Sequence, residues 1–339
     1  MGRRHSLDLG SISPDELADL GVSVDEVMCG IFKIDTRRAV LALERRMTAA
    51  FSAAWQSAAR EGLTEGIAKL LRGPFTDTRI NSFLRGLGVK LSDTLTSKQE
   101  KLVEGRVRSI YSLSKREAVR QAKGKFVFGA LDTRAIAATN NQQMFWINGF
   151  YGDQLSSRVS AVSRDVLLEQ GLGRREAGRT LMSALRKDLG LAPGAAPSEF
   201  AASVPARYAG NPQYYFEQVA SVAGHQGRVF GRMRGFKDVG VVTFELINPM
   251  DERTGQVCQE MHGQVFSVDV GVSRMDAIVR ARTPDAVKRS APWLSGKELQ
   301  NLLKGTQKGS SEASRRLEGK NVVLPPFHPL CRTEPVIVS

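Results

Sequence analysis

The sequence predicts a mainly α-helical protein that ends in a small α+β unit. Amphipathic segments with apolar residues at helical spacing dominate the chain up to about residue 238. The segment Val239–Ile247 differs, because it is largely β-branched and apolar and is the clearest strand in the sequence. It leads directly into a short block that contains cysteine and histidine. The expected order is therefore a long helical N-terminal part and then a compact α+β cap.

The composition is that of a globular protein. The 339 residues are 42% hydrophobic and 24% charged, so the chain can bury a sizeable core. No apolar run is long enough to cross a bilayer, and the basic start Met1–Ser6 is not followed by an apolar segment. We therefore expect neither a membrane partner nor a secretory signal. The three widely spaced cysteines argue against a disulfide scaffold and suit a reducing cytosol.

The chain is strongly basic, with a net charge of +13 and a pI near 9.9. Such a charge attracts a polyanion such as DNA, and the attraction weakens as the salt concentration rises. A well-solvated surface would give the same composition, and no recognised nucleic-acid-reading motif accompanies the charge. Double-stranded DNA is therefore one candidate partner.

The helices of the first half are predicted from periodicity and from capping residues. Thr36–Glu61 carries apolar residues at a spacing near 3.6, with a charged opposite face. A short helix near Ile80–Leu84 should end at Gly86-Leu87-Gly88. The sequence Ser97-Lys98-Gln99-Glu100 is a capping box that should open a separate helix toward Gln121.

The second half is expected to alternate helices with a few strands. Expected helices cover residues 133–148, 153–170, 174–189, 273–281 and 295–303, and another begins near residue 212. Expected strands cover residues 239–247, 264–268 and 335–338. The polar segment 304–320 is expected to begin as a mobile loop.

Two groups of residues are interpreted as structural rather than functional. The run Asn140-Asn141-Gln142-Gln143 is expected to be a polar, exposed part of a helix. Aromatic residues of the helix that begins near residue 212 could stack on bases, since arginines lie close by, but packing in the core is favoured. The aromatic residues are Tyr214, Tyr215 and Phe230, and the nearby arginines are Arg228 and Arg232.

Two short blocks near the C-terminus combine cysteine with histidine. Cys258 and His262 are four residues apart, so one helical turn would aim both side chains at a common point. His328 and Cys331 are three residues apart in a proline-flanked turn. Together the four side chains form a plausible tetrahedral zinc shell with a structural role. The alternative is that both cysteines are buried thiols and both histidines are hydrogen-bonded structural residues.

Asp251 and Arg253 follow the end of the predicted strand, a position where function often lies. A carboxylate next to an arginine and near a metal could indicate hydrolytic chemistry. A structural interpretation is favoured, with Asp251 capping the turn and Arg253 pairing with a local carboxylate or packing under the loop. The sequence contains none of the phosphate-loop, serine-elbow or zinc-protease motifs. We therefore expect no enzymatic activity.

These blocks resemble the phage Mu F-like minor head protein family, also called phage head morphogenesis proteins. The family pattern is a strand, Asp-x-Arg-Thr-Cys-x-x-Cys-x-x-x-(His)-Gly, a second strand, and finally Pro-Pro-x-His-Pro-x-Cys-Arg-Cys. The turn and helix start Glu169–Ala177 is similar to the opening of the family domain. The C-terminal matches are Asp251, Arg253, Thr254, Cys258, His262, Gly263, Pro325, Pro326, His328, Pro329, Cys331 and Arg332.

The resemblance covers residues 153–339 and differs from the family pattern at two positions. Gly255 stands where many members have a cysteine, and Thr333 stands where the closing cysteine often lies. The resemblance implies a helical N-terminal region at 1–152 and a Mu F-like domain at 153–339, with the α+β cap beginning at about residue 239. The candidate metal ligands remain Cys258, His262, His328 and Cys331.

The resemblance also implies a function in the virion. Family members are low-copy minor capsid components inside the head, near the portal, that act in head assembly or genome delivery. The implied partners are the portal protein, the major capsid protein and packaged DNA, and the implied locations are the capsid interior and, during assembly, the host cytoplasm. Two alternatives remain: a metal-dependent nuclease that uses His262 or His328 with Asp251, and a non-specific DNA-binding protein.

Overall fold

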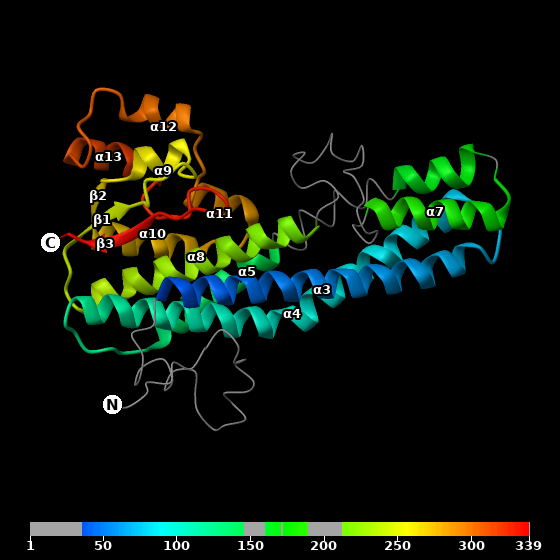
Figure 1. Cartoon of the computed structure of the whole chain (residues 1–339), viewed down its shortest axis with the longest axis horizontal. Helices are drawn as coiled ribbons and strands as arrows, with labels where there is room; N and C mark the ends of the chain where they lie inside the picture. Colours follow the sequence, from blue (N-terminus) through cyan, green and yellow to red (C-terminus); the bar gives the residue numbers. More distant parts are fainter. Residues whose placement is uncertain (1–35, 146–159, 171, 189–211, 339) are drawn as a thin grey trace, which may run out of the picture.

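The computed structural model describes residues 36–145, 160–170, 172–188 and 212–338. Within these ranges, long helices lie side by side, and a unit of short helices and one small sheet covers one end of them (Figure 1). The predicted fold class is confirmed: the protein is mainly α, with a small α+β unit near the C-terminus.

We call the long helices the helical body. Its helices are α3 (Thr36–Leu70), α4 (Asp77–Gln121), α5 (Ala130–Phe145), α7 (Arg174–Asp188) and α8 (Pro212–Asp238). A π-helical turn at Asp165–Glu169 precedes α7.

We call residues 243–338 the C-terminal unit. Its helices are α9 (Gln256–Met261), α10 (Val268–Arg280), α11 (Pro284–Ser290), α12 (Gly296–Leu303) and α13 (Ser311–Gly319). Its strands are β1 (Thr243–Ile247), β2 (Val265–Ser267) and β3 (Glu334–Ile337).

Helix α4 is longer than predicted and corrects two expectations. It runs without a break through Gly86-Leu87-Gly88 and through Ser97, so the glycines end no helix and the serine begins none. Leu87 is buried in the core, whereas a Cβ at Gly86 or at Gly88 would meet no atom within 4 Å. Each glycine costs a helix about 1 kcal/mol relative to alanine. Burial of the apolar face against α3 offsets this cost.

Helix α8 lies close to α4 because glycines face the contact. A Cβ at Gly231 would lie 2.4 Å from the carbonyl oxygen of Tyr111, and one at Gly235 would lie 3.0 Å from that of Lys115. A larger residue at either position would push the two helices apart. The spacing of four residues places both glycines on one face of α8.

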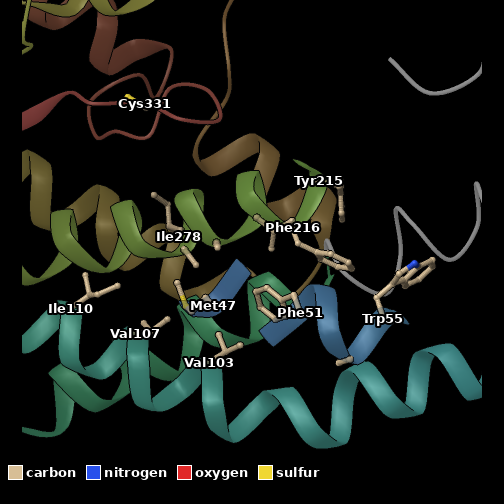
Figure 2. Close-up of a cluster of buried hydrophobic side chains, with 14 of the residues drawn as sticks. Met47, Phe51, Trp55, Val103, Val107, Ile110, Tyr215, Phe216, Ile278 and Cys331 are labelled. Carbon is tan, nitrogen blue, oxygen red and sulfur yellow. The ribbon is translucent and has the colours of Figure 1, made fainter. Parts of the chain in front are cut away.

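The apolar core runs along the contacts of α3, α4 and α8 (Figure 2). The ring of Phe216 lies 5.7 Å from Phe51 and 6.0 Å from Trp55, measured between centroids. Tyr215, Val219 and Phe230 of α8 are also buried, which confirms the core interpretation of these residues.

Several buried charged groups of the helical body form ion pairs. The Lys115 ammonium, 1% exposed, lies 2.9 Å from Asp132 and 2.7 Å from Asp238. Arg232 of α8 lies 2.9 Å from Glu117 of α4, and Arg228 lies 2.7 Å from Glu334 of β3. The arginines of α8 therefore join the helices to the sheet and are not displayed for stacking on bases.

The expectation of an exposed stretch at Asn140–Gln143 is wrong for three of the four side chains. Asn140, Gln142 and Gln143 are at most 3% exposed. The Gln142 amide donates a hydrogen bond to the Ile278 carbonyl and accepts one from Gln226. The helix turns these side chains inward, where α5 packs against α8 and α10.

The sheet is antiparallel, with strand order β2-β1-β3. Ile247 at the end of β1 pairs with Glu334 at the start of β3. This register brings the residues after β1 next to those before β3. Figure 1 shows both segments beside α9.

Two helices of the C-terminal unit were not predicted. Helix α13 forms within the polar segment 304–320, with Ser310 as its N-cap and Ala313 and Leu317 buried. Helix α11 begins after the N-cap Thr283. The division into residues 1–152 and 153–339 stays a prediction, and its boundary lies outside the described residues.

Candidate metal centre

The two cysteine- and histidine-containing blocks meet because β1 and β3 are neighbours. After β1 the chain turns through Asn248–Gly255 into the short helix α9, which carries Cys258. His328 and Cys331 lie in the loop that leads into β3. Figure 2 shows Cys331 on this loop, with α8 between it and α4.

Three of the four predicted ligands form one group. The Cys258 sulfur lies 2.8 Å from Nε2 of His328 and 3.8 Å from the Cys331 sulfur. The ligand atoms of these three residues all lie within 4.8 Å of one another, and neither thiol is in a disulfide. Both cysteines are buried and His328 is half-buried. The group can hold a metal ion.

The His328 ring is oriented by its own loop. Its Nδ1 lies 2.6 Å from the Pro329 carbonyl oxygen, which can only accept a hydrogen bond. Nδ1 therefore carries the proton, and Nε2 directs its lone pair toward Cys258. Histidines that bind metals typically donate their second nitrogen to a carbonyl or carboxylate in this way.

The two thiols differ in acidity. A hydrogen bond from Cys331 lowers the pKa of Cys258 to about 7, with further contributions from Thr333 and Arg332. Burial, followed by the neighbouring Cys258, raises the pKa of Cys331. Cys258 is therefore the more readily ionised of the two thiols, and a thiolate at Cys331 as well requires a nearby cation. A divalent metal ion would supply that charge.

His262 lies outside the group. Helix α9 ends at Met261, and His262 takes an extended backbone conformation with φ −63° and ψ 129°. Its ring Nδ1 accepts a hydrogen bond from the Asn248 backbone at 3.0 Å. The expected helical turn is therefore incomplete, and Cys258 and His262 do not share its face. Gly263 follows with φ +80°, a conformation that favours glycine.

Thr333 is a polar neighbour that the sequence did not single out as part of the site. Its hydroxyl oxygen lies 3.3 Å from the Cys258 sulfur and 3.4 Å from the Cys331 sulfur, and the side chain is fully buried. The hydroxyl also lies 2.9 Å from the Asn248 side-chain oxygen, to which it can donate. The difference from the family pattern at position 333 was the available signal.

An ion pair between Asp251 and Arg332 links the turn after β1 to the loop before β3. Two nitrogens of Arg332 bind the two carboxylate oxygens of Asp251, one of them at 2.8 Å. Asp251 also accepts hydrogen bonds from the Arg253 backbone and the Thr254 hydroxyl, which agrees with its predicted role as a turn cap. The Arg332 hydrogen bond, the largest effect, lowers the pKa of Asp251.

Arg253 has a different environment from the one expected. Asp251 binds the Arg332 side chain and only the backbone of Arg253. The Arg253 side chain instead lines a cavity next to the loop. No carboxylate joins Cys258, His328 and Cys331 in the group described above.

Among the described residues, no helix is both long enough and apolar enough to cross a membrane. Comparison of the chain with protein-family models, with curated proteins and with solved structures found no match.

Proposed function

We propose that this chain is a phage minor head protein of the Mu F-like type. In this proposal a zinc ion bound by Cys258, His328 and Cys331 stabilises the C-terminal unit. The supporting observation is that residues of the resemblance, far apart in sequence, meet at one place. Cys258 contacts His328, 70 residues away, and Asp251 binds Arg332, 81 residues away. The residues that carry the resemblance thus lie together in one compact part of the chain, which supports the proposal.

The donor set suits zinc, which binds thiolate and imidazole in structural sites. Zn–S bonds of about 2.3 Å and Zn–N bonds of about 2.0–2.1 Å place tetrahedral sulfurs about 3.8 Å apart, and a sulfur and a nitrogen about 3.6 Å apart. The observed sulfur–sulfur distance of 3.8 Å matches. The observed sulfur–nitrogen distance of 2.8 Å is shorter, so binding requires a small outward movement of the His328 ring.

Elemental analysis of the purified protein tests the zinc part of the proposal. We expect one zinc per chain, and loss of zinc on Cys258→Ser, Cys331→Ser or His328→Ala. His262→Ala is the matched control and should retain the metal, because His262 lies outside the group. Zinc lost equally in His262→Ala, or retained in Cys331→Ser, would contradict the proposed ligand set.

The proposed place of action is the inside of the capsid, with the portal protein and the major capsid protein as partners. Mass spectrometry of particles purified from the phage that encodes this chain tests this assignment. A few copies per particle are expected, with the chain already present in assembling heads. Its absence from both assembling heads and mature particles would refute the virion role, whatever metal the protein binds.

The net charge of +13 favours a second property, sequence-independent contact with packaged DNA. Binding of a DNA duplex should weaken steeply as salt is raised, because counterions are released from the DNA. Binding that is independent of salt would contradict this. Incubation with plasmid and divalent metal checks the nuclease alternative, which cleavage that is lost in His328→Ala would favour.

A further inference from the structure

A cavity of about 590 Å³, with both polar and apolar walls, lies next to the loop that carries Cys331. Its walls come from the start of α3, the middle of α8, and the loops that carry Arg253 and Leu330–Glu334. A cavity of this volume is of the size that takes a small organic molecule. Only Cys331 of the three metal-binding candidates forms part of its wall.

The charged groups of the cavity leave an excess of positive charge. Arg332 is bound by Asp251, and Arg228 forms an ion pair with Glu334. Arg45 and Arg253 are exposed and form no ion pair with another described residue. Their guanidinium groups come from α3 and from the turn after β1, and both line the cavity.

Glu44 does not cancel this charge. Burial raises its pKa to about 8, and the nearby Arg228 only partly opposes the shift, so the carboxyl is mainly protonated at neutral pH. Glu217 is the other acidic residue of the lining that forms no ion pair described above. Two unpaired guanidinium groups therefore face one carboxylate.

The cavity wall also offers neutral hydrogen-bonding groups. The Glu44 carboxyl lies against the backbone of α8 at Gly224, where a Cβ would come within 2.4 Å of its Oε1. Ser221 contributes a hydroxyl from the preceding turn of α8, and Thr48 contributes one from α3 that donates to the Glu44 carbonyl and can still accept a hydrogen bond. A protonated carboxyl and two hydroxyls can bind the hydroxyl groups of a sugar.

We propose that this cavity binds a small organic phosphate that carries sugar hydroxyls, with Arg45 and Arg253 holding the phosphate group. Arginine suits this task because its planar donors match phosphate oxygens. Glu44, Ser221 and Thr48 would contact the hydroxyls. The cavity adjoins the metal group at Cys331, but the residues proposed to hold the ligand are not metal ligands, and the proposal does not depend on the virion assignment.

Isothermal titration of the full-length, metal-containing protein with ribose 5-phosphate tests the proposal. We expect saturable binding of one ligand per chain, and at least about tenfold weaker binding of ribose, which lacks the charge. Arg45→Gln and Arg253→Gln should each weaken binding by about tenfold. Both side chains are exposed, so neither change should unfold the protein.

Arg60→Gln is the matched control, because Arg60 is also an exposed arginine of α3 but does not line the cavity. Its affinity for ribose 5-phosphate should equal that of the unchanged protein. No saturable binding, equal binding of ribose, or equal losses in all three arginine variants would overturn the proposal. Displacement of ribose 5-phosphate by a short DNA duplex would also overturn it, because the arginines would then serve the DNA backbone.

Discussion

The helical body and the C-terminal unit are held together in different ways. In the helical body, helices of up to 45 residues enclose most of an apolar core in which Phe51, Trp55 and Phe216 are almost completely buried, and this core continues into the C-terminal unit. In the C-terminal unit the strands have five, three and four residues. Side chains there tie one loop to the backbone of another: Trp293 donates to the Pro326 carbonyl, and Asn321 donates to that of Arg289.

The comparison shows that the two regions depend on different parts of the sequence. Packing of long amphipathic helices follows from a repeated pattern, so many residues contribute a little each. The loops of the C-terminal unit depend on single contacts between distant residues, such as Arg332 with Asp251. Loss of one such contact should loosen that unit alone, whereas a large hole in the helical core should destabilise the whole chain.

The largest effect is expected from Phe51→Ala in the helical body. The side chain is fully buried against Phe216, so its removal should lower the free energy of unfolding by about 3–5 kcal/mol. Denaturant unfolding measures this cost. Leu41→Ala, in the same helix but 43% exposed, should cost less than about 1 kcal/mol. Equal costs for the two variants would mean that the core does not carry the stability of the body.

Cys331→Ser should destabilise the C-terminal unit alone. This prediction rests on the proposed zinc site. Loss of the metal should remove about 2–4 kcal/mol of stability, since a bound ion stabilises only the folded form. Hydrogen exchange should accelerate in α9 and the strands and stay slow in α3 and α4. Chelator should reproduce this pattern in the unchanged protein. Faster exchange throughout the helical body would contradict the separation of the two regions.

Glu44→Gln should stabilise the protein by up to about 3 kcal/mol at neutral pH. The folded protein holds the Glu44 proton up to about pH 8, whereas the unfolded chain releases it near pH 4.5. Glu44 therefore lowers the stability progressively as the pH rises between these values, and glutamine removes this penalty. Melting temperatures of both proteins at pH 4 and pH 8 check the prediction. A difference that is the same at both pH values would contradict it.

Substitutions of Thr333 should have the smallest effect on stability. They separate its hydrogen bond to Asn248 from its position next to the two cysteine sulfurs. Thr333→Val leaves the buried Asn248 oxygen without its donor and should cost about 1 kcal/mol. Thr333→Cys adds a third thiol next to two others and should raise the affinity for zinc, which a competition assay with a chromogenic chelator measures. Equal zinc affinity in the unchanged protein, Thr333→Val and Thr333→Cys would mean that the side chain at position 333 does not contact the metal.

Much of the helical body could be predicted because periodic signals are local. The predicted helix Thr36–Glu61 lies within α3, the helix expected from near residue 212 is α8, and in the C-terminal unit the helix expected at 295–303 is α12. The predicted break at Gly86-Leu87-Gly88 was wrong because local glycine costs are smaller than the gain from burying Leu87. The burial of Asn140–Gln143 also depended on neighbouring helices, which supply partners for Gln142.

The candidate metal site was predicted in part. Residue type and spacing indicated Cys258, His328 and Cys331, and the structure brings these three together. Spacing also indicated His262, but α9 ends at Met261, so His262 lies outside the helix and is not part of the group. Thr333 was missed as a neighbour because a threonine carries no metal-binding signal of its own.

The sequence by itself determined the mainly helical fold class, the place of the β segments and the residue types of the cysteine–histidine group. These features depend on periodicity and side-chain chemistry, which can be read from short stretches of sequence. Only the tertiary structure decided which groups meet: the pairing of β1 with β3 places Cys258 beside Cys331, and α3, α8 and the C-terminal loops together form the cavity. Such contacts join residues far apart in sequence, so no local pattern specifies them.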